Sequence, residues 1–253
     1  MSRPLVVAYH GLADLPHRLD PSGMMVSPES FRRQIARLRR RGYGFVTQTE
    51  FARCLKAGEP LDDTCSLTFD DAPADNASTL VALLGELDLC ATVFACPGLL
   101  GQPYPFVAAE TEMRICTIEE IRLLAATPRV EIGSHTRVHT ELSRAGPEEA
   151  YAEMRGSRED LETMLGVEVR SFAYPSCGYS PACPAAAERA GYTSAVTCGP
   201  LGGLSAFELE RASPSPGDGA WVFELKTRGV FFFVRDLPPM RVARWALRPL
   251  RYR

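Results

Sequence analysis

Short apolar runs alternate with helix-like stretches along most of the chain. Runs of four to six residues predict buried strands, and apolar side chains at helical spacing predict helices between them. The predicted strands are Leu5–Tyr9, Cys65–Phe69, Ala91–Ala95, Val130–Gly133, Ser171–Tyr174 and Ser194–Thr197. The predicted helices begin after Ser27, Asp75 and Thr117 and at Pro147 and Pro184. Because strand and helix alternate, we expect parallel strands with helical crossovers, in an open α/β sheet or a barrel.

The pattern becomes less regular from about residue 200. Residues 213–219, SPSPGDG, predict a loop, and residues 221–234 predict late strands. The tail at 241–253 carries five arginines, no acid and Trp245. We find no repeat and no linker, so the sequence predicts one domain over residues 1–253 with a less regular extension from about 200.

Polar residues lie just beyond the ends of three predicted strands: Asp70-Asp71, His135 and the Tyr174-Pro175 turn. In parallel α/β folds, this rim carries the active site. Two adjacent carboxylates repel unless a cation or a shared proton relieves them, although a turn-starting Asp beside a helix cap would explain them equally well in isolation.

His135 and His139 have an H-x₃-H spacing, which allows two imidazoles to bind one metal. Two histidines four residues apart are by themselves more commonly surface or core residues. The chain has only four histidines, however, and two of them accompany the carboxylate pair. Together these residues favour a catalytic metal site of the His₂Asp type with open positions.

The composition indicates which binding partners and which cellular compartment to expect. The net charge of −3 and the pI near 5.9 argue against a nucleic-acid partner. No run approaches the roughly 20 apolar residues of a membrane span, and the N-terminal apolar stretch is too short for a secretory signal, so we expect a cytoplasmic protein. The eight cysteines are scattered through apolar segments without a CxxC pair, which predicts reduced and mostly buried thiols.

Three motifs together resemble a known family. LTFDD at 67–71, GSHTRVH at 133–139 and FAYP at 172–175 are similar to the motifs of the polysaccharide deacetylases of carbohydrate esterase family 4, the NodB-homology domain. The resemblance covers roughly residues 5–200. It implies an α/β fold, a distorted (β/α) barrel of about seven strands, and a metal-dependent amide hydrolase that removes acetyl groups from N-acetylated sugars.

The resemblance also implies roles for individual residues. Asp70 matches the general base, and Asp71, His135 and His139 match the ligands of a divalent metal, usually Zn²⁺. The backbone N–H of Ser176, which follows Pro175, matches the oxyanion donor. Around it, Cys177 is expected to line the substrate pocket as a free side chain, while Tyr174 and Tyr179 either stack on a sugar ring or pack in the core.

The general acid lies outside these motifs. The common family order ends with an L-x-H motif, yet no histidine follows His139. His10 ends the run VVAYH, which resembles a branch with this motif at the N-terminus, as though circularly permuted. Since the first and last strands of a closed barrel are neighbours, we assign His10 as the acid. A structural histidine at a strand end is the alternative, and His17 is a weaker candidate.

The chain departs from the family pattern at three positions. Ala72 replaces the glycine after the Asp pair, which would cost about 1–2 kcal/mol if φ there is positive. The third motif of the family usually carries an arginine near position 173 that orients the base. This chain has Ala173 there, and Arg170 is three residues away. Cys177 replaces a second glycine. None of these changes removes a metal ligand or the base.

Several functions remain compatible with the sequence. The first is deacetylation of an N-acetylated sugar or a sugar-containing biosynthetic intermediate. The alternatives are hydrolysis of a small non-sugar amide or imide, and a catalytically silent, metal-containing carbohydrate-binding module. The basic tail at 241–253 predicts peripheral contact with an anionic membrane or lipid-linked substrate, unless it is a solvated helix end.

Overall fold

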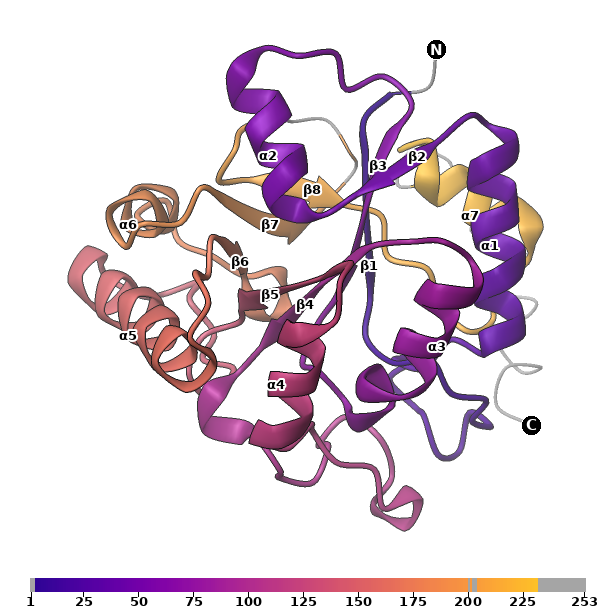
Figure 1. The fold of residues 1–253 in the computed structure, drawn as a ribbon, viewed down its shortest axis with the longest axis horizontal. Helices are drawn as coiled ribbons and strands as arrows, with labels where there is room; N and C mark the ends of the chain where they lie inside the picture. Colours follow the sequence, from indigo (N-terminus) through magenta and orange to yellow (C-terminus); the bar gives the residue numbers. More distant parts are fainter. Residues whose placement is uncertain (1–2, 200, 202–203, 232–253) are drawn as a thin grey trace.

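The computed structural model describes residues 3–199, 201 and 204–231, and its centre is a parallel sheet rolled into a barrel (Figure 1). The strand order is β1-β3-β4-β5-β6-β7-β8, and β2 pairs with β3 outside this path. The strands are β1 (Leu5–Tyr9), β2 (Gly44–Val46), β3 (Thr64–Phe69), β4 (Ala91–Ala95), β5 (Val130–Ser134), β6 (Ser171–Ala173), β7 (Ser194–Cys198) and β8 (Leu209–Arg211). Every pair in the order is parallel, as the alternation of strands and helices predicted.

The first and last strands of the path meet. The N–H of Ala8 donates to the carbonyl of Ala212 at 2.8 Å, and the N–H of Ala212 donates to the carbonyl of Val6 at 2.9 Å. These two bonds join β1 to the chain directly after β8. The predicted (β/α) barrel of about seven strands is therefore confirmed.

Helices surround the barrel (Figure 1). They are α1 (Pro28–Arg40), α2 (Gln48–Ala57), α3 (Thr79–Glu86), α4 (Ile118–Ala126), α5 (Pro147–Leu165), α6 (Cys183–Arg189) and α7 (Ala220–Thr227). Short 3-10 helices lie at Ala74–Ala77 (η1), Pro97–Leu99 (η2), Ala109–Thr111 (η3) and Pro175–Cys177 (η4). Side chains fix the starts of three helices: Ser27 accepts from the N–H of Ser30, Thr47 accepts from the N–H of Glu50, and Thr117 forms a capping box with Glu120.

Two clusters of buried side chains hold these layers together. The larger one packs β1 and β3 against α1, whose apolar face carries Phe31, Ile35 and Leu38. The smaller one joins Phe51 of α2 to single residues from five strands, Val6, Phe94, Ala173, Val196 and Leu209. Since neighbouring residues of β1 belong to different clusters, this strand is apolar on both faces, as is common in parallel sheets covered on both sides.

Predictions for the later chain and for residues 44–57 were wrong or incomplete. Residues 221–234 were predicted as strands, but Ala220–Thr227 is the helix α7. A strand is suggested by Trp221, Val222 and Phe223. The segment forms a helix because the residues that follow, Glu224–Lys226, are strong helix formers. The sequence pattern also missed β2, α2 and β8. Residues 232–234 and the basic tail at 241–253 lie outside the described residues.

The start of α3 also differs from the prediction. Asp75 was expected to cap this helix, but it lies in η1, and Ser78 occupies the N-cap position. The Asp75 carboxylate instead accepts from the N–H of Leu12 at 2.6 Å.

The expectation that all cysteines are reduced was wrong for one pair. Cys177 and Cys198 form a disulfide with a Cα–Cα distance of 5.3 Å, which is ordinary for this bond. The fold brings η4 beside the end of β7, and spacing along the chain does not reveal such proximity. The other six cysteines are free, and four of them are buried.

Among the described residues, no helix combines the length and apolar character that a membrane crossing requires.

Candidate metal-dependent active site

Asp71, His135 and His139 meet at the rim where β3 and β5 end. One ligand atom from each lies within 4.8 Å of the others. Oδ1 of Asp71 is 3.5 Å from Nε2 of His135 and 3.6 Å from Nε2 of His139. Tetrahedral zinc ligands lie about 3.4 Å apart, because each is about 2.1 Å from the metal. The spacing and the N, N, O donor set therefore fit a divalent metal such as Zn²⁺.

The hydrogen bonds of His135 prepare it as a ligand. Its Nδ1 lies 2.8 Å from the carbonyl of Ala173, which can only accept, so Nδ1 carries the proton and Nε2 presents a lone pair. Burial is the largest influence on this side chain and lowers its pKa below 6.5, although the carboxylates of Asp70 and Asp71 act in the opposite direction. His135 is therefore neutral at neutral pH, as a metal ligand must be.

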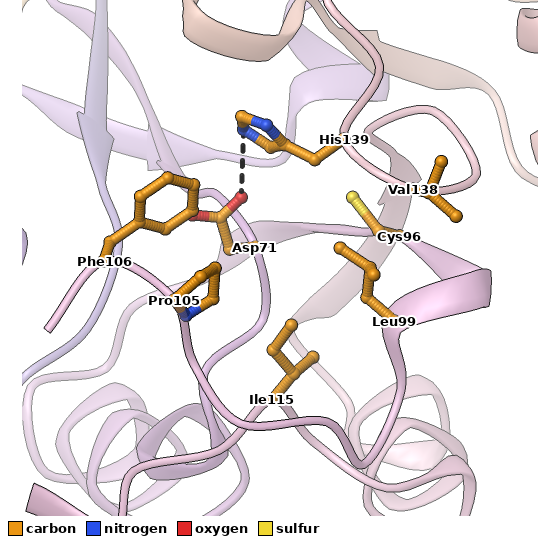
Figure 2. Close-up of a pocket in the computed structure, with 8 residues that line it drawn as sticks. All are labelled: Asp71, Cys96, Leu99, Pro105, Phe106, Ile115, Val138 and His139. Carbon is orange, nitrogen blue, oxygen red and sulfur yellow. Dashed lines mark ion pairs between the residues drawn. The ribbon is translucent and has the colours of Figure 1, made fainter. Parts of the chain in front are cut away.

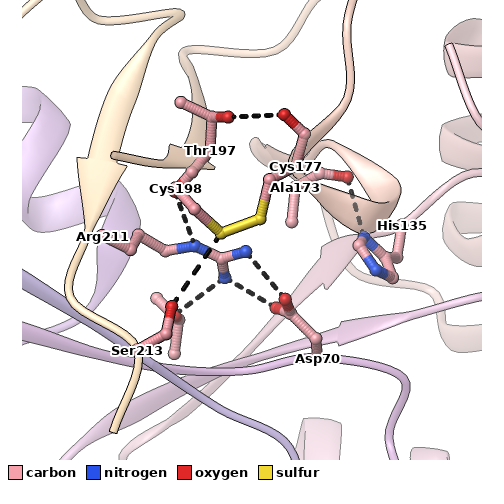
Figure 3. The surroundings of a disulfide bond; sticks show 9 residues. Asp70, His135, Ala173, Cys177, Thr197, Cys198, Arg211 and Ser213 are labelled. Atoms are coloured by element: carbon pink, nitrogen blue, oxygen red, sulfur yellow. Dashed lines mark hydrogen bonds and ion pairs between the residues drawn. A yellow bond between two sulfur atoms is a disulfide. The ribbon is translucent and has the colours of Figure 1, made fainter. Parts of the chain in front are cut away.

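Asp70 is paired with an arginine that the motifs did not indicate. Both terminal nitrogens of Arg211 donate to the carboxylate, each at 2.7 Å, and both side chains are almost fully buried (Figure 3). Arg211 also donates to the hydroxyl of Thr68 and to the carbonyl of Thr197. Burial alone would raise the pKa of Asp70, but the charge of Arg211 and its paired hydrogen bonds hold it below 3.8.

The chain lacks the arginine that the family usually carries near position 173, where it has Ala173, and Arg211 contacts Asp70 instead. Arg170, three residues away, lies exposed beside Glu168. Arg211 ends β8, which has only three residues, so neither periodicity nor a motif marked it. The one available signal was a positive charge at the end of the short run Phe207–Arg211.

The loop that carries Asp71 has left-handed backbone at two successive residues. Asp71 has φ 66° and Ala72 has φ 51°. The glycine expected at position 72 would adopt this conformation freely, so Ala72 carries the strain of about 1–2 kcal/mol. The N–H of Cys116 donates to the carbonyl of Ala72 at 2.9 Å and helps to hold the loop.

His10 lies beside Asp70. Tyr9 is in register with Phe69, and the N–H of Asp70 donates to the carbonyl of Tyr9, so the next residues along both strands are neighbours at the rim. The side-chain amide of Asn76 donates to the carbonyl of His10 at 3.1 Å. His17, the other candidate acid, is exposed in the loop after β1.

The turn at 174–177 places its residues in different environments. Tyr174 is fully buried: its hydroxyl donates to the carbonyl of Phe207 and its ring stacks on Tyr179. Tyr174 was expected either to stack on a sugar ring or to pack in the core, and in the structure it packs in the core. Pro175 is buried as well, whereas Ser176 is exposed and its N–H lies in the first turn of η4, where helical donors lack acceptors.

Cys177 is not the free pocket-lining side chain that we expected. It forms the disulfide with Cys198, and its carbonyl accepts from the hydroxyl of Thr197 at 3.0 Å (Figure 3). Its φ of 60° explains why a glycine was expected here.

A pocket of about 280 Å³ opens beside the metal ligands (Figure 2). Its polar wall is Asp71 and His139, and the remaining side chains are apolar or weakly polar. These are Cys96, Leu99, Pro105, Phe106, Ile115 and Val138. The ring centre of Phe106 lies 5.2 Å from that of His139. The arrangement places an apolar surface next to the candidate metal centre.

Known proteins share both sequence and fold with this chain. YxkH of Bacillus subtilis (strain 168), provisionally named a polysaccharide deacetylase, is 26% identical over 217 residues, which cover 84% of this chain and 71% of that protein. The structure of the Streptococcus pyogenes deacetylase PplD in complex with acetate superposes with a TM-score of 0.73 at 22% identity, covering 88% of this chain and 97% of PplD. IcaB from Ammonifex degensii gives a TM-score of 0.70 at 19% identity, covering 91% and 98% of the two chains.

The match to a family model is broader than any single motif. The model for polysaccharide deacetylase matches residues 57–195, more than half of the chain, and this range includes the Asp pair, both motif histidines and the 172–175 turn. The chain therefore belongs to the polysaccharide deacetylase family.

Proposed function

We propose that this protein is a divalent-metal-dependent N-deacetylase that hydrolyses the acetamido group of an N-acetylated sugar. The observation that carries the proposal is the grouping of Asp71, His135 and His139 beside the buried Asp70–Arg211 pair. Two imidazole nitrogens and one carboxylate oxygen suit Zn²⁺, which we propose as the metal.

Asp70 is the proposed general base. When bound, the metal lowers the pKa of a water molecule and polarises the amide carbonyl. Arg211 keeps Asp70 ionised, so the carboxylate is available to accept a proton from that water at neutral pH.

The other groups serve the carbonyl oxygen and the departing nitrogen. Ser176 is an exposed residue in η4, and its N–H is the proposed donor to the developing oxyanion. The amine must be protonated as it leaves, since an amide anion is a poor leaving group. His10, at the rim beside Asp70, is the proposed acid.

The proposal is tested by metal content and acetate release from N-acetylglucosamine and its oligomers. The wild type should hold about one divalent ion and release acetate. In Asp70→Asn, acetate release should fall by about 10²–10⁴-fold while the metal stays bound. His135→Ala should lose both the metal and the activity. Asp88→Asn, at a side chain that is 80% exposed, is the matched control and should retain both.

Two results would contradict the proposal. A wild type that holds metal but releases no acetate from any of these sugars would remove the deacetylase function. An Asp70→Asn variant with wild-type turnover would remove the proposed base.

A further inference from the structure

Tyr104 contacts the candidate metal centre, and the proposed reaction does not use this contact. Its hydroxyl donates to Oδ2 of Asp71 at 3.0 Å, and its side chain is only 3% exposed. We propose that Tyr104 is a positioning residue that fixes the Asp71 carboxylate so that a single oxygen faces the metal. This inference rests on the metal site of the proposed function.

The two oxygens of Asp71 are used differently. Oδ1 faces His135 and His139 at 3.5 and 3.6 Å, whereas Oδ2 is occupied by the hydroxyl of Tyr104. A carboxylate that binds through one oxygen occupies one coordination position, and a catalytic zinc site needs open positions for water and substrate. The hydroxyl of Tyr104 thus keeps Asp71 from occupying a second position.

The backbone holds Tyr104 in place from two sides. Its own N–H donates to the carbonyl of Met113 at 2.9 Å, and the N–H of Ile115 donates to the carbonyl of Gln102 at 2.8 Å, so residues 102–115 form two paired arms. The second arm is tied to the loop of Asp71, because the N–H of Ala74 donates to the carbonyl of Arg114 at 2.9 Å. The segment that carries Tyr104 and the loop that carries Asp71 therefore form one hydrogen-bonded unit.

The surroundings of Tyr104 strengthen its hydrogen bond. Tyr104, Met25 and Ile115 form a buried apolar cluster, and the ring of Phe106 packs edge-on against Tyr104 at 5.4 Å between centroids. Tyr104 and Asp71 are both buried, and a hydrogen bond to a charged oxygen is stronger at low dielectric. Without the hydroxyl, Oδ2 would lose this donor in an apolar environment.

The test compares Tyr104→Phe with the matched control Tyr43→Phe. Tyr43 is similarly buried, and its hydroxyl donates to the carbonyl of Arg3 at 2.8 Å, near the opposite end of β3 from Asp71. Zn²⁺ affinity is measured by titration calorimetry in competition with a chelator, and thermal unfolding of the metal-free proteins reports the loss of packing and hydrogen bonding alone.

Tyr104→Phe should weaken Zn²⁺ binding by about 10–100-fold, the effect usual for a partner that orients a metal ligand. Tyr43→Phe should stay within about twofold of the wild type, although both metal-free variants unfold at lower temperature than the wild type. Wild-type affinity in Tyr104→Phe, or an equal loss of affinity in Tyr43→Phe, would overturn the inference.

This readout separates the inference from the proposed function. If the wild type binds Zn²⁺ but releases no acetate, the proposed deacetylase function fails. The role of Tyr104 still stands in that case if Tyr104→Phe binds Zn²⁺ more weakly than the wild type. A wild type that binds no Zn²⁺ overturns both.

Discussion

The ion pair between Asp70 and Arg211 lies almost fully buried within the site. Both partners are buried, with side-chain exposures of 7% and 1%, and the carboxylate receives two hydrogen bonds from one guanidinium. Breaking such a pair is costly because the remaining charge stays buried and unpaired. Arg211 thus serves the stability of the barrel as well as the charge state of the proposed base.

We predict that Arg211→Met lowers the free energy of unfolding at pH 7 by about 3–5 kcal/mol. The control is Arg189→Met, which removes an exposed ion pair with Glu148 and should cost less than about 1 kcal/mol. Urea unfolding of the metal-free proteins measures both. Equal losses in the two variants would show that the buried pair contributes no more than a surface one.

The same variant should also change how stability depends on pH. In the wild type, the pKa of folded Asp70 lies below the usual 3.8, so its contribution is present above pH 3.8 and is lost as the pH falls. Without Arg211, burial dominates and raises the pKa of folded Asp70 above 3.8. Ionised Asp70 then lowers the stability of the folded state instead of raising it. Arg211→Met should therefore recover stability relative to the wild type as the pH falls from 7 to 4, and a constant difference would contradict this.

Residues within motifs could be located from the sequence, and residues outside them could not. Asp70, Asp71, His135 and His139 follow predicted strands, so the shared rim of a parallel sheet brought them together as expected. Arg211 and Tyr104 act through contacts between distant segments. Each belongs to a short strand or a loop whose sequence has no periodicity, and only the folded barrel shows what it contacts.

At the scale of elements, η4 has left-handed backbone at two successive residues, as the loop of Asp71 does. Ser176 and Cys177 both have positive φ, at 53° and 60°, without a glycine at either position. The disulfide to Cys198 and the hydrogen bond from Thr197 tie this turn to the end of β7. The proposed oxyanion donor, the N–H of Ser176, thus depends on a covalent tie within its own turn.

We predict that Cys177→Ser/Cys198→Ser lowers kcat for acetate release about tenfold or more, because a displaced N–H stabilises the oxyanion less well. Zn²⁺ affinity should not change, since the disulfide contacts none of the three ligands. Steady-state kinetics and calorimetry measure the two effects, with Cys54→Ser, at a free and half-buried thiol, as the control. Unchanged turnover in the double variant would show that the turn keeps its shape unaided.

Element length accounts for part of what could be predicted, although the three-residue β6 was found within the run Ser171–Tyr174 and the ten-residue α2 was missed. Strands of five or six residues, such as β1, β3 and β4, stand out as apolar runs, and α5 stands out by its length and its proline start. β2 and β8 have three residues each, too few for an alternation to be recognised. α7 begins with aromatic and β-branched residues, so its local composition favours the wrong structure.

At the scale of the whole molecule, metal binding should be linked to folding. The three ligands come from loops after β3 and β5, and only the folded barrel brings them within 4.8 Å of one another. A metal that binds the folded state stabilises it by about 4 kcal/mol at a free concentration 1,000 times the Kd.

We therefore predict that saturating Zn²⁺ raises the Tm by on the order of 10 °C relative to protein treated with a chelator. His135→Ala should abolish this shift, whereas His17→Ala, at an exposed position in the loop after β1, should retain it. Differential scanning calorimetry measures the shift. Identical melting of the metal-loaded and chelated wild type would contradict the prediction.

The closure of the barrel between β1 and the residues after β8 also sets the order in which the site is completed during synthesis. A chain leaving the ribosome contains His10 and all three ligands well before β8 emerges. Until Arg211 arrives, Asp70 has no guanidinium beside it and β1 has no partner on its second edge. A chain that terminates between His139 and β8 would thus carry every proposed metal ligand but not the guanidinium that pairs with the proposed base, so we expect the proposed hydrolytic activity only in chains whose translation has passed the last strand of the barrel.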